Sequence, residues 1–245
     1  MADYYYKEIF EQNGASYHHA MKTWPRVRDE EFAAALSYLK GKGGQILDVP
    51  AGGGYLKAYL PDAWIYLGKD FSGGFDANHN LVVKCSEIDL GVPASSFDAV
   101  ICLAAMHHVE NKEAFFKAAK KALKPDGIFL IGDVIKESKE AEFLNGFVND
   151  WNSLGHDGDF IDQKRDIELL KKNGFESDYK RSDYHWNFAN KQQAFSYFRH
   201  LFTLDKNPSD DHLGKAIRKL NARESSEGFH TVSYTHLTLP TTPYV

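Results

Sequence analysis

Short apolar runs alternate with amphipathic segments through the first half of the chain. Five runs have the length of strands, and the fourth is almost continuously apolar, as expected for a strand buried on both faces. These runs span 45–49, 63–68, 81–85, 96–103 and 128–134. Strands that alternate with helices at this spacing predict an α/β fold with a right-handed, doubly wound, mostly parallel sheet.

Helices are predicted where apolar residues recur every three or four positions. Over 29–41, Phe32, Leu36 and Leu39 share one face, acidic residues begin the segment and glycines end it. The same spacing predicts helices at 111–123, 141–154, 162–173, 190–203 and 208–222. A sixth strand is expected within 175–188, and the start of a last strand at 228–231.

Length and composition favour a single domain. A chain of 245 residues, 43% of them hydrophobic, is long enough to bury a sizeable core. We expect one domain over 1–231, with an N-terminal segment (1–28), a ligand-binding core (29–134) and substrate-side helices and last strands (135–231). Residues 232–245 contain no Lys, Arg, Asp or Glu, and we interpret them as a tail that is not native to the domain.

The first 28 residues are rich in aromatic residues and histidine but lack a clean period. Two interpretations of this segment stay open. Its aromatic side chains pack the helix at 29–41 onto the sheet, or the segment covers a bound ligand as a lid.

Charge and cysteine content limit which partners and which cellular compartment we expect. A formal charge of −5 does not favour nucleic acid as a partner, because proteins that bind it are usually basic. Cys85 and Cys102 lie in apolar runs, which fits two reduced thiols in a cytoplasmic protein. No apolar run approaches the length of a membrane span, and the first residues do not resemble a signal peptide. We therefore expect a soluble, cytoplasmic protein with no membrane segment.

The segment 45–56 carries the strongest signal. An apolar run ends at Asp48, three glycines follow at 52–54, and apolar residues resume at Tyr55 and Leu56. This order indicates a strand, a tight turn and a helix, and glycine there allows positive φ and close approach of the backbone to a ligand. Such a turn at the carboxyl end of a parallel strand suits a nucleotide-like ligand.

The stretch 48–54, DVPAGGG, resembles the D-x-G-x-G-x-G signature of the class I S-adenosylmethionine-dependent methyltransferases. Asp48, Gly52 and Gly54 fill three of its four fixed positions. Pro50 stands where the first glycine is usual, which removes one backbone N–H and fixes φ.

Three further segments, GKDFS at 68–72, SFDAV at 96–100 and LKPDG at 123–127, are also similar to this family. The resemblance covers 29–134. It implies a seven-stranded Rossmann-like sheet that binds S-adenosylmethionine.

The resemblance also implies which residues hold the cofactor. Asp70, about twenty residues past the start of the glycine motif, is expected to hold the ribose hydroxyls. Glu87 or Asp89 is expected beside the adenine amino group, with both left open. Arg28 is a candidate partner for the cofactor's carboxylate; otherwise it pairs with a neighbouring acid. The expected cofactor contacts are Arg28, Asp48, Pro50, Ala51, Gly52, Gly54, Asp70, Phe71, Glu87, Asp89 and Leu103.

Two adjacent histidines after the fourth strand are the candidate catalytic residues. His107 and His108 match the family's segment at this place, which faces the transferred methyl group. An imidazole with a pKa of about 6.5 suits a general base that takes a proton from an O–H or N–H acceptor. Which of the two touches the acceptor stays open, and His156, Tyr17 and His18 are weaker candidates.

The function predicted from these features is methyl transfer from S-adenosylmethionine to a small-molecule acceptor. One rival is a non-catalytic protein that binds the cofactor or a partner on the same fold, which Pro50 favours. A second is a nucleotide-dependent oxidoreductase, although G-x-G-x-x-G is absent. We expect no metal site, because adjacent histidines rarely give two ligands to one zinc ion and no C-x-x-C occurs.

Overall fold

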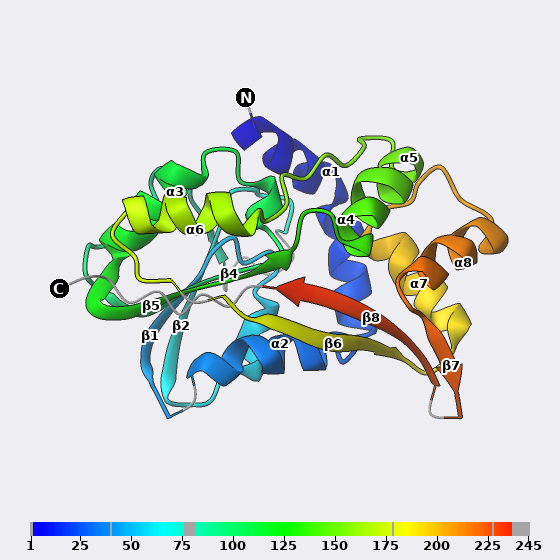
Figure 1. The fold of residues 1–245 in the computed structure, drawn as a ribbon, viewed down its shortest axis with the longest axis horizontal. Helices are drawn as coiled ribbons and strands as arrows, with labels where there is room; N and C mark the ends of the chain where they lie inside the picture. Colours follow the sequence, from blue (N-terminus) through cyan, green and yellow to red (C-terminus); the bar gives the residue numbers. More distant parts are fainter. Residues whose placement is uncertain (1, 40, 76–81, 178, 227, 237–245) are drawn as a thin grey trace.

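A computed structural model describes residues 2–39, 41–75, 82–177, 179–226 and 228–236. Its eight strands form one sheet, with seven in the order β3-β2-β1-β4-β5-β8-β6 and β7 paired to β8 (Figure 1). Their bounds are β1 (Gly44–Asp48), β2 (Trp64–Asp70), β3 (Val82–Lys84), β4 (Phe97–Leu103), β5 (Leu123–Val134), β6 (Arg181–Phe188), β7 (Arg223–Ser225) and β8 (Gly228–His236). The first five strands are parallel and β8 runs antiparallel to β5 and β6, which confirms the predicted sheet; the extra strand is the three-residue β7.

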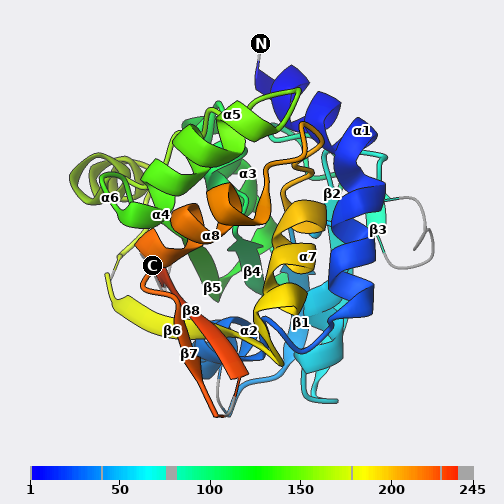
Figure 2. The same cartoon turned by 90° about the vertical axis from the view of Figure 1, so that its right-hand side faces the viewer.

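Helices cover both faces of the sheet, with α3 and α6 on one side and α2 on the other (Figure 1). The long α1 packs along α7 (Figure 2). The main helices are α1 (Ala2–Thr23), α2 (Asp29–Leu36), α3 (Lys112–Ala122), α6 (Gln163–Lys172), α7 (Lys191–Leu201) and α8 (Asp210–Lys219). Shorter turns are η1 (Ser37–Leu39), η2 (Tyr55–Tyr59), η4 (Met106–His108), α4 (Lys139–Glu142), η5 (Phe143–Val148) and α5 (Asn149–Trp151).

Alternate residues of the central strands supply two separate cores. Ile46 of β1 and Ile101 of β4 face the core that contains α2 and α7, while Leu47 and Val100 face the core that contains α3 and α6. All four side chains are fully buried. This is why the runs are apolar at every position: successive side chains point to opposite faces, and both faces are covered.

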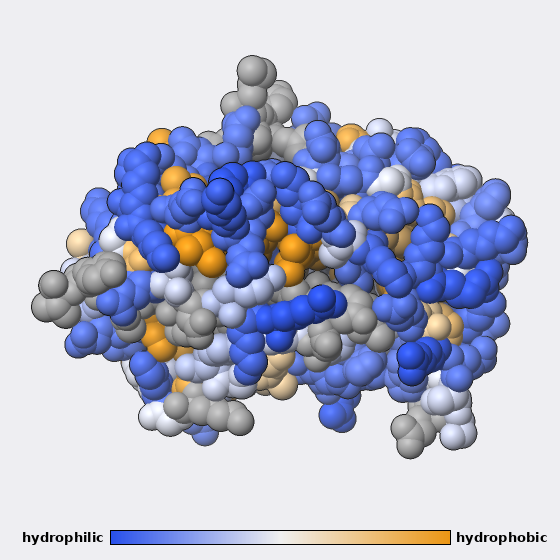
Figure 3. Space-filling model, viewed as in Figure 1, coloured by the Kyte–Doolittle hydropathy of each residue, from blue (hydrophilic) through white to orange (hydrophobic). Residues whose placement is uncertain are grey.

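The outer surface is mostly hydrophilic on the face shown in Figure 3, with apolar residues exposed in small patches between polar ones. No helix in the described part of the chain has the length and apolar character that a membrane span requires.

Several predicted elements differ in detail. The segment 1–28, for which no helix was predicted, is mostly the helix α1; aromatic and polar residues share its faces, which hides the helical period. The segment after the glycine turn is a five-residue 3-10 helix, η2, because Pro61 follows closely. The predicted helix 141–154 is helical but widens to a π-helix at η5. Strand β6 begins at Arg181, after the loop that opens the predicted span 175–188.

The end of the chain also differs from expectation. Strand β8 continues to His236, and its residues Val232–His236 pair with Arg181–His185 of β6. The boundary expected at residue 231 therefore falls inside a strand that lies between β5 and β6. Residues 237–245, the rest of the expected tail, lie outside the described part.

Helix α1 approaches the loop after β2 so closely that two glycines are required. A Cβ built on Gly14 would overlap the backbone of Gly74, and one on Gly74 would overlap the carbonyl of Phe10. Backbone atoms cannot move aside cheaply, so any side chain here separates α1 from the loop.

We predict that Gly14→Ala lowers the free energy of unfolding by about 1–3 kcal/mol, the usual cost of overpacking. Gly146→Ala is the matched control, because a Cβ at Gly146 meets no atom within 4 Å and alanine favours helix. Chemical denaturation of both variants tests this. Equal stability of Gly14→Ala and the native sequence would contradict the close contact.

Candidate active site

The glycine turn is tied to the end of β2 by one buried carboxylate. Asp70 accepts hydrogen bonds from the backbone N–H of Gly52 (2.7 Å), the N–H of Ser72 (2.8 Å) and the hydroxyl of Tyr6 (3.1 Å). Gly52 and Gly54 both have positive φ, 55° and 75°, so the turn needs glycine at these positions. The predicted motif therefore forms the expected tight turn, with the N-terminal helix reaching into it.

A cleft lies beside this turn, at the carboxyl ends of β1 and β4. Six of the eleven expected cofactor contacts line it, together with aromatic residues of α1 and the loop after β2. They are Arg28, Asp48, Pro50, Ala51, Gly52 and Leu103. Asp70 and Gly54 do not line the cleft but fix the turn. Asp70 accepts from the N–H of Gly52, and Gly54 adopts a positive φ.

The remaining expected contacts have other partners. Glu87 is buried and accepts from the backbone N–H groups of Glu110 (3.3 Å) and Asn111 (3.2 Å), which fixes the start of α3. Asp89 is exposed and accepts from the N–H of Gly91. Phe71 is buried against Tyr6, with ring centroids 5.6 Å apart.

Arg28 is buried in the wall between the cleft and a larger pocket, and it lines both. Its guanidinium makes a two-pronged ion pair with Glu31 and donates to the Tyr17 hydroxyl at 2.6 Å. Glu31 also accepts from the indole N–H of Trp186 (2.9 Å). Arg28 thus pairs with a neighbouring acid, in the interior and not on the surface.

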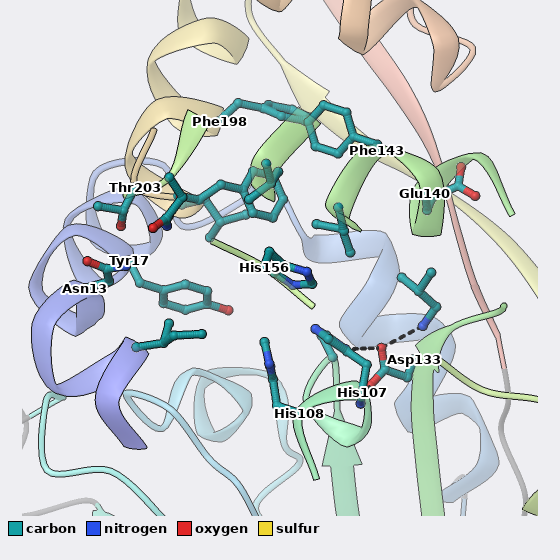
Figure 4. Close-up of a pocket in the computed structure, with 18 of the residues that line it drawn as sticks. Asn13, Tyr17, His107, His108, Asp133, Glu140, Phe143, His156, Phe198 and Thr203 are labelled. Carbon is teal, nitrogen blue, oxygen red and sulfur yellow. Dashed lines mark hydrogen bonds and ion pairs between the residues drawn. The ribbon is translucent and has the colours of Figure 1, made fainter. Parts of the chain in front are cut away.

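The larger pocket is mostly apolar. Its walls come from η5, β6, α7 and the segments after α7 and α8. The apolar side chains that line it include Phe10, Phe143, Leu144, Trp186, Phe198, Phe202 and Leu220. His107, His108 and His156 lie at its floor, and Figure 4 shows the three rings gathered there from two different segments of the chain.

His107 is held by a buried carboxylate at the end of β5. Asp133 is fully buried; its Oδ1 lies 2.7 Å from Nδ1 of His107, and its Oδ2 accepts from the backbone N–H of His107 at 2.9 Å (Figure 4). Burial alone would raise the pKa of Asp133, but the charge of His107 and these N–H donors lower it below the usual value. An ionised carboxylate only accepts hydrogen bonds, so Nδ1 of His107 carries a proton and Nε2 is left for the pocket.

The other two histidines stay neutral. Burial, followed by the charges of the neighbouring imidazoles, lowers the pKa of His108 well below its usual value. Burial and then His107 lower the pKa of His156 to about 3. Nδ1 of His156 lies 2.9 Å from Oδ1 of Asn145.

The model of the methyltransferase domain family matches residues 47–131, which run from β1 into β5 and include the glycine turn. Residues 47–131 therefore resemble a methyltransferase domain. The cofactor of this family is S-adenosylmethionine.

Known proteins resemble this chain over different lengths. The erythromycin 3''-O-methyltransferase of Saccharopolyspora erythraea is 44% identical over 50 residues, which cover 20% of this chain and 16% of that protein. A putative methyltransferase solved with the Haloferax volcanii Trm112 activator matches with a TM-score of 0.63 and 16% identity, over 96% of this chain and 98% of that chain. Haemonchus contortus phosphoethanolamine N-methyltransferase 2, solved with phosphomonomethylethanolamine and S-adenosylhomocysteine, matches with a TM-score of 0.55 and 18% identity. That match covers 87% of this chain and 52% of the nematode chain, so this chain spans about half the length of the nematode chain.

Sequence reasoning missed three residues of this site. Asp133 lies in the run 128–134, which predicts only a strand. An acid near the end of a parallel strand, next to the strand that precedes the histidines, was a usable signal. Glu31 appeared only as a helix-start acid. Tyr6 gave no signal, because its contact with Asp70 spans 64 residues.

The buried acids at the glycine turn make stability depend on pH. Burial raises the pKa of Asp48 to about 7, although the Tyr66 hydroxyl opposes the shift. The unfolded chain ionises near the ordinary value of 3.8, so the folded protein binds more protons between about pH 4 and pH 7. The contribution of Asp48 to stability is therefore full below this window and is lost as pH rises through it.

We predict that Asp48→Asn flattens the fall in melting temperature between pH 5 and pH 8. Asp98→Asn is the control: burial opposes its charge, but Lys124 and the N–H of Gln45 lower the pKa of Asp98, so it titrates below this range. Thermal denaturation across pH compares the two. An unchanged slope in Asp48→Asn would show that this carboxyl is ionised in the folded protein.

Proposed function

We propose that this methyltransferase transfers the methyl group of S-adenosylmethionine to an O–H or N–H group of a small, largely apolar molecule. The observation that carries the proposal is the buried His107–Asp133 pair at the floor of an apolar pocket, next to the cleft beside the glycine turn. The cofactor supplies a methyl group on a sulfonium, which the acceptor attacks in line.

The residues of the cleft fit this cofactor. Asp70 already accepts a hydroxyl hydrogen bond from Tyr6, which is the interaction that a ribose hydroxyl requires. The cofactor's ribose would take the place of the Tyr6 hydroxyl, while Gly52 continues to hold the carboxylate. We propose that Arg28, which lines the cleft, binds the cofactor's carboxylate while it shares its guanidinium with Glu31.

The larger pocket fits the acceptor. Its apolar walls would exclude water from the apolar part of the acceptor. The polar histidines at its floor would bind the reactive group of the acceptor. We propose that a substrate held here presents its O–H or N–H to the histidines at the floor of the pocket.

His107 is the better of the two candidate bases. Its Nε2 accepts the proton of the acceptor, and the ionised Asp133 orients the ring and stabilises the imidazolium that forms. Burial and the neighbouring imidazoles lower the pKa of His108, which disfavours a positive charge on its ring. We therefore assign it to shaping the floor of the pocket.

One observation favours the non-catalytic alternative. The Tyr6 hydroxyl already donates to the Asp70 carboxylate that the ribose is proposed to use. Pro50 has no backbone N–H that could bind a ligand in the turn. Calorimetry with S-adenosylmethionine, S-adenosylhomocysteine and NAD separates a methyltransferase, a binding protein and an oxidoreductase.

We predict that Asp70→Asn weakens S-adenosylmethionine binding by about 1.5–3 kcal/mol, because a charge-assisted acceptor is replaced by a neutral one. Asp98→Asn is the matched control, since Asp98 pairs with Lys124 and the N–H of Gln45 at the start of β4, away from the cleft. Calorimetry measures both affinities, and melting curves confirm that both variants fold. A dissociation constant unchanged by Asp70→Asn removes Asp70 from the site.

We predict that His107→Ala and Asp133→Asn each reduce turnover by about 10²–10⁴-fold with cofactor affinity unchanged. His185→Ala is the control, because this ring is about half exposed beside Glu30 on α2. Formation of S-adenosylhomocysteine with a panel of hydroxylated and aminated aromatic acceptors measures turnover. Full turnover in His107→Ala rules out its role as the base.

A further inference from the structure

We propose that His107, His108 and His156 form an open site for a borderline transition-metal ion of the Zn²⁺ type. One ring nitrogen from each histidine lies within 4.8 Å of the others, and all three residues are buried. Among the described residues this is the group of histidine, cysteine and acid side chains with metal-binding geometry. Figure 4 shows that the rings surround a common point at the floor of the pocket.

Hydrogen bonds place a proton on Nδ1 of both His107 and His156. Oδ1 of Asn145 accepts from the backbone N–H of Gly158 at 2.8 Å, and its Nδ2 donates to the carbonyl of Gly158 at 3.0 Å. The amide orientation is therefore set, and Nδ1 of His156 must be the donor to Oδ1. Asp133 fixes Nδ1 of His107 in the same way.

In its neutral form each ring therefore keeps the lone pair on Nε2, the atom a metal would bind. A carboxylate or amide oxygen behind the protonated nitrogen is the usual outer-shell partner of a histidine ligand. The fully buried Asp133 also supplies negative charge next to a divalent cation in an otherwise apolar pocket.

The loop that carries His156 is held against the first two histidines. A Cβ on Gly158 would lie 2.9 Å from Cδ2 of His107 and 3.1 Å from Cε1 of His156, so only glycine lets these rings approach. The N–H of Asp159 donates to the carbonyl of His107 at 2.8 Å, and Nζ of Lys112 donates to the carbonyl of Asp159 at 2.7 Å. The three ligands are thus brought together by a tethered backbone.

The spacing suits zinc after a small adjustment. Zinc–nitrogen bonds of 2.0–2.1 Å at tetrahedral angles place ligand nitrogens about 3.4 Å apart. The present separations exceed this by about 1.4 Å at most, which modest rotation of the imidazoles removes. Three neutral imidazoles leave the fourth position for water or an acceptor oxygen from the pocket, the arrangement of an open zinc site.

The proposed metal site can be tested separately from the proposed methyl transfer. A bound ion uses the same Nε2 lone pair of His107 that the proposed base uses, so the two roles exclude each other in one molecule. Metal binding is measured without cofactor or acceptor, whereas the base is tested in metal-free enzyme. Failure of either proposal is therefore visible without the other.

The experiment titrates Co²⁺ into chelator-treated protein and follows the visible absorption of the ion, with Zn²⁺ added afterwards to displace it. We expect one ion per chain, and at least a tenfold loss of affinity in both His156→Ala and His108→Ala. Asn145→Ala, which removes an outer-shell partner, should weaken binding about 10–100-fold. Melting curves without metal identify a variant that fails to fold, and His156→Gln, of closer size, then replaces His156→Ala.

His200→Ala is the matched control, because His19 and His200 form a second close ring pair, with centroids 4.4 Å apart. This variant should bind Co²⁺ as the native chain does. Loss of binding in His200→Ala, unchanged binding in folded His156 variants, or no binding of Co²⁺ or Zn²⁺ to the native protein would each overturn the proposal.

Discussion

A buried carboxyl group needs hydrogen-bond partners. Three such groups are buried at the carboxyl ends of β1, β2 and β5. Asp48 uses the Tyr66 hydroxyl, Asp70 uses two backbone N–H groups and Tyr6, and Asp133 uses the backbone and ring of His107. Leaving such a group unsatisfied is costly, so each acid selects the conformation of the segment beside it. The glycine turn, the start of α1 and the histidine turn η4 are all positioned in this way.

Much of the fold was predictable because its signals are local. The five parallel strands follow from apolar runs that are buried on both faces, and Asp48, Gly52 and Asp70 follow from a motif within 25 residues. The two features missed outside the five parallel strands, the helix α1 and the continuation of β8, have residues whose period is masked by aromatic and polar side chains.

The candidate site was predictable only where it is contiguous. His107 was found from its place after β4, but its partner Asp133 lies 26 residues away and depends on the pairing of β4 with β5. His156 joins the site through a loop whose position rests on the hydrogen bonds of Asn145 with Gly158. Such tertiary contacts have no periodicity, so neither composition nor spacing reports them.

The ion pair between Arg28 and Glu31 has a consequence for how two ligands sense each other. Arg28 lines both the cleft and the larger pocket, while Glu31 lines the pocket and holds Trp186 in its wall. The two compartments thus share one charged partition. A ligand that drew the guanidinium toward the cleft would weaken its ion pair with Glu31, the residue that accepts from Trp186 in the pocket wall. By linkage, any effect of that ligand on affinity in the pocket would be reciprocal.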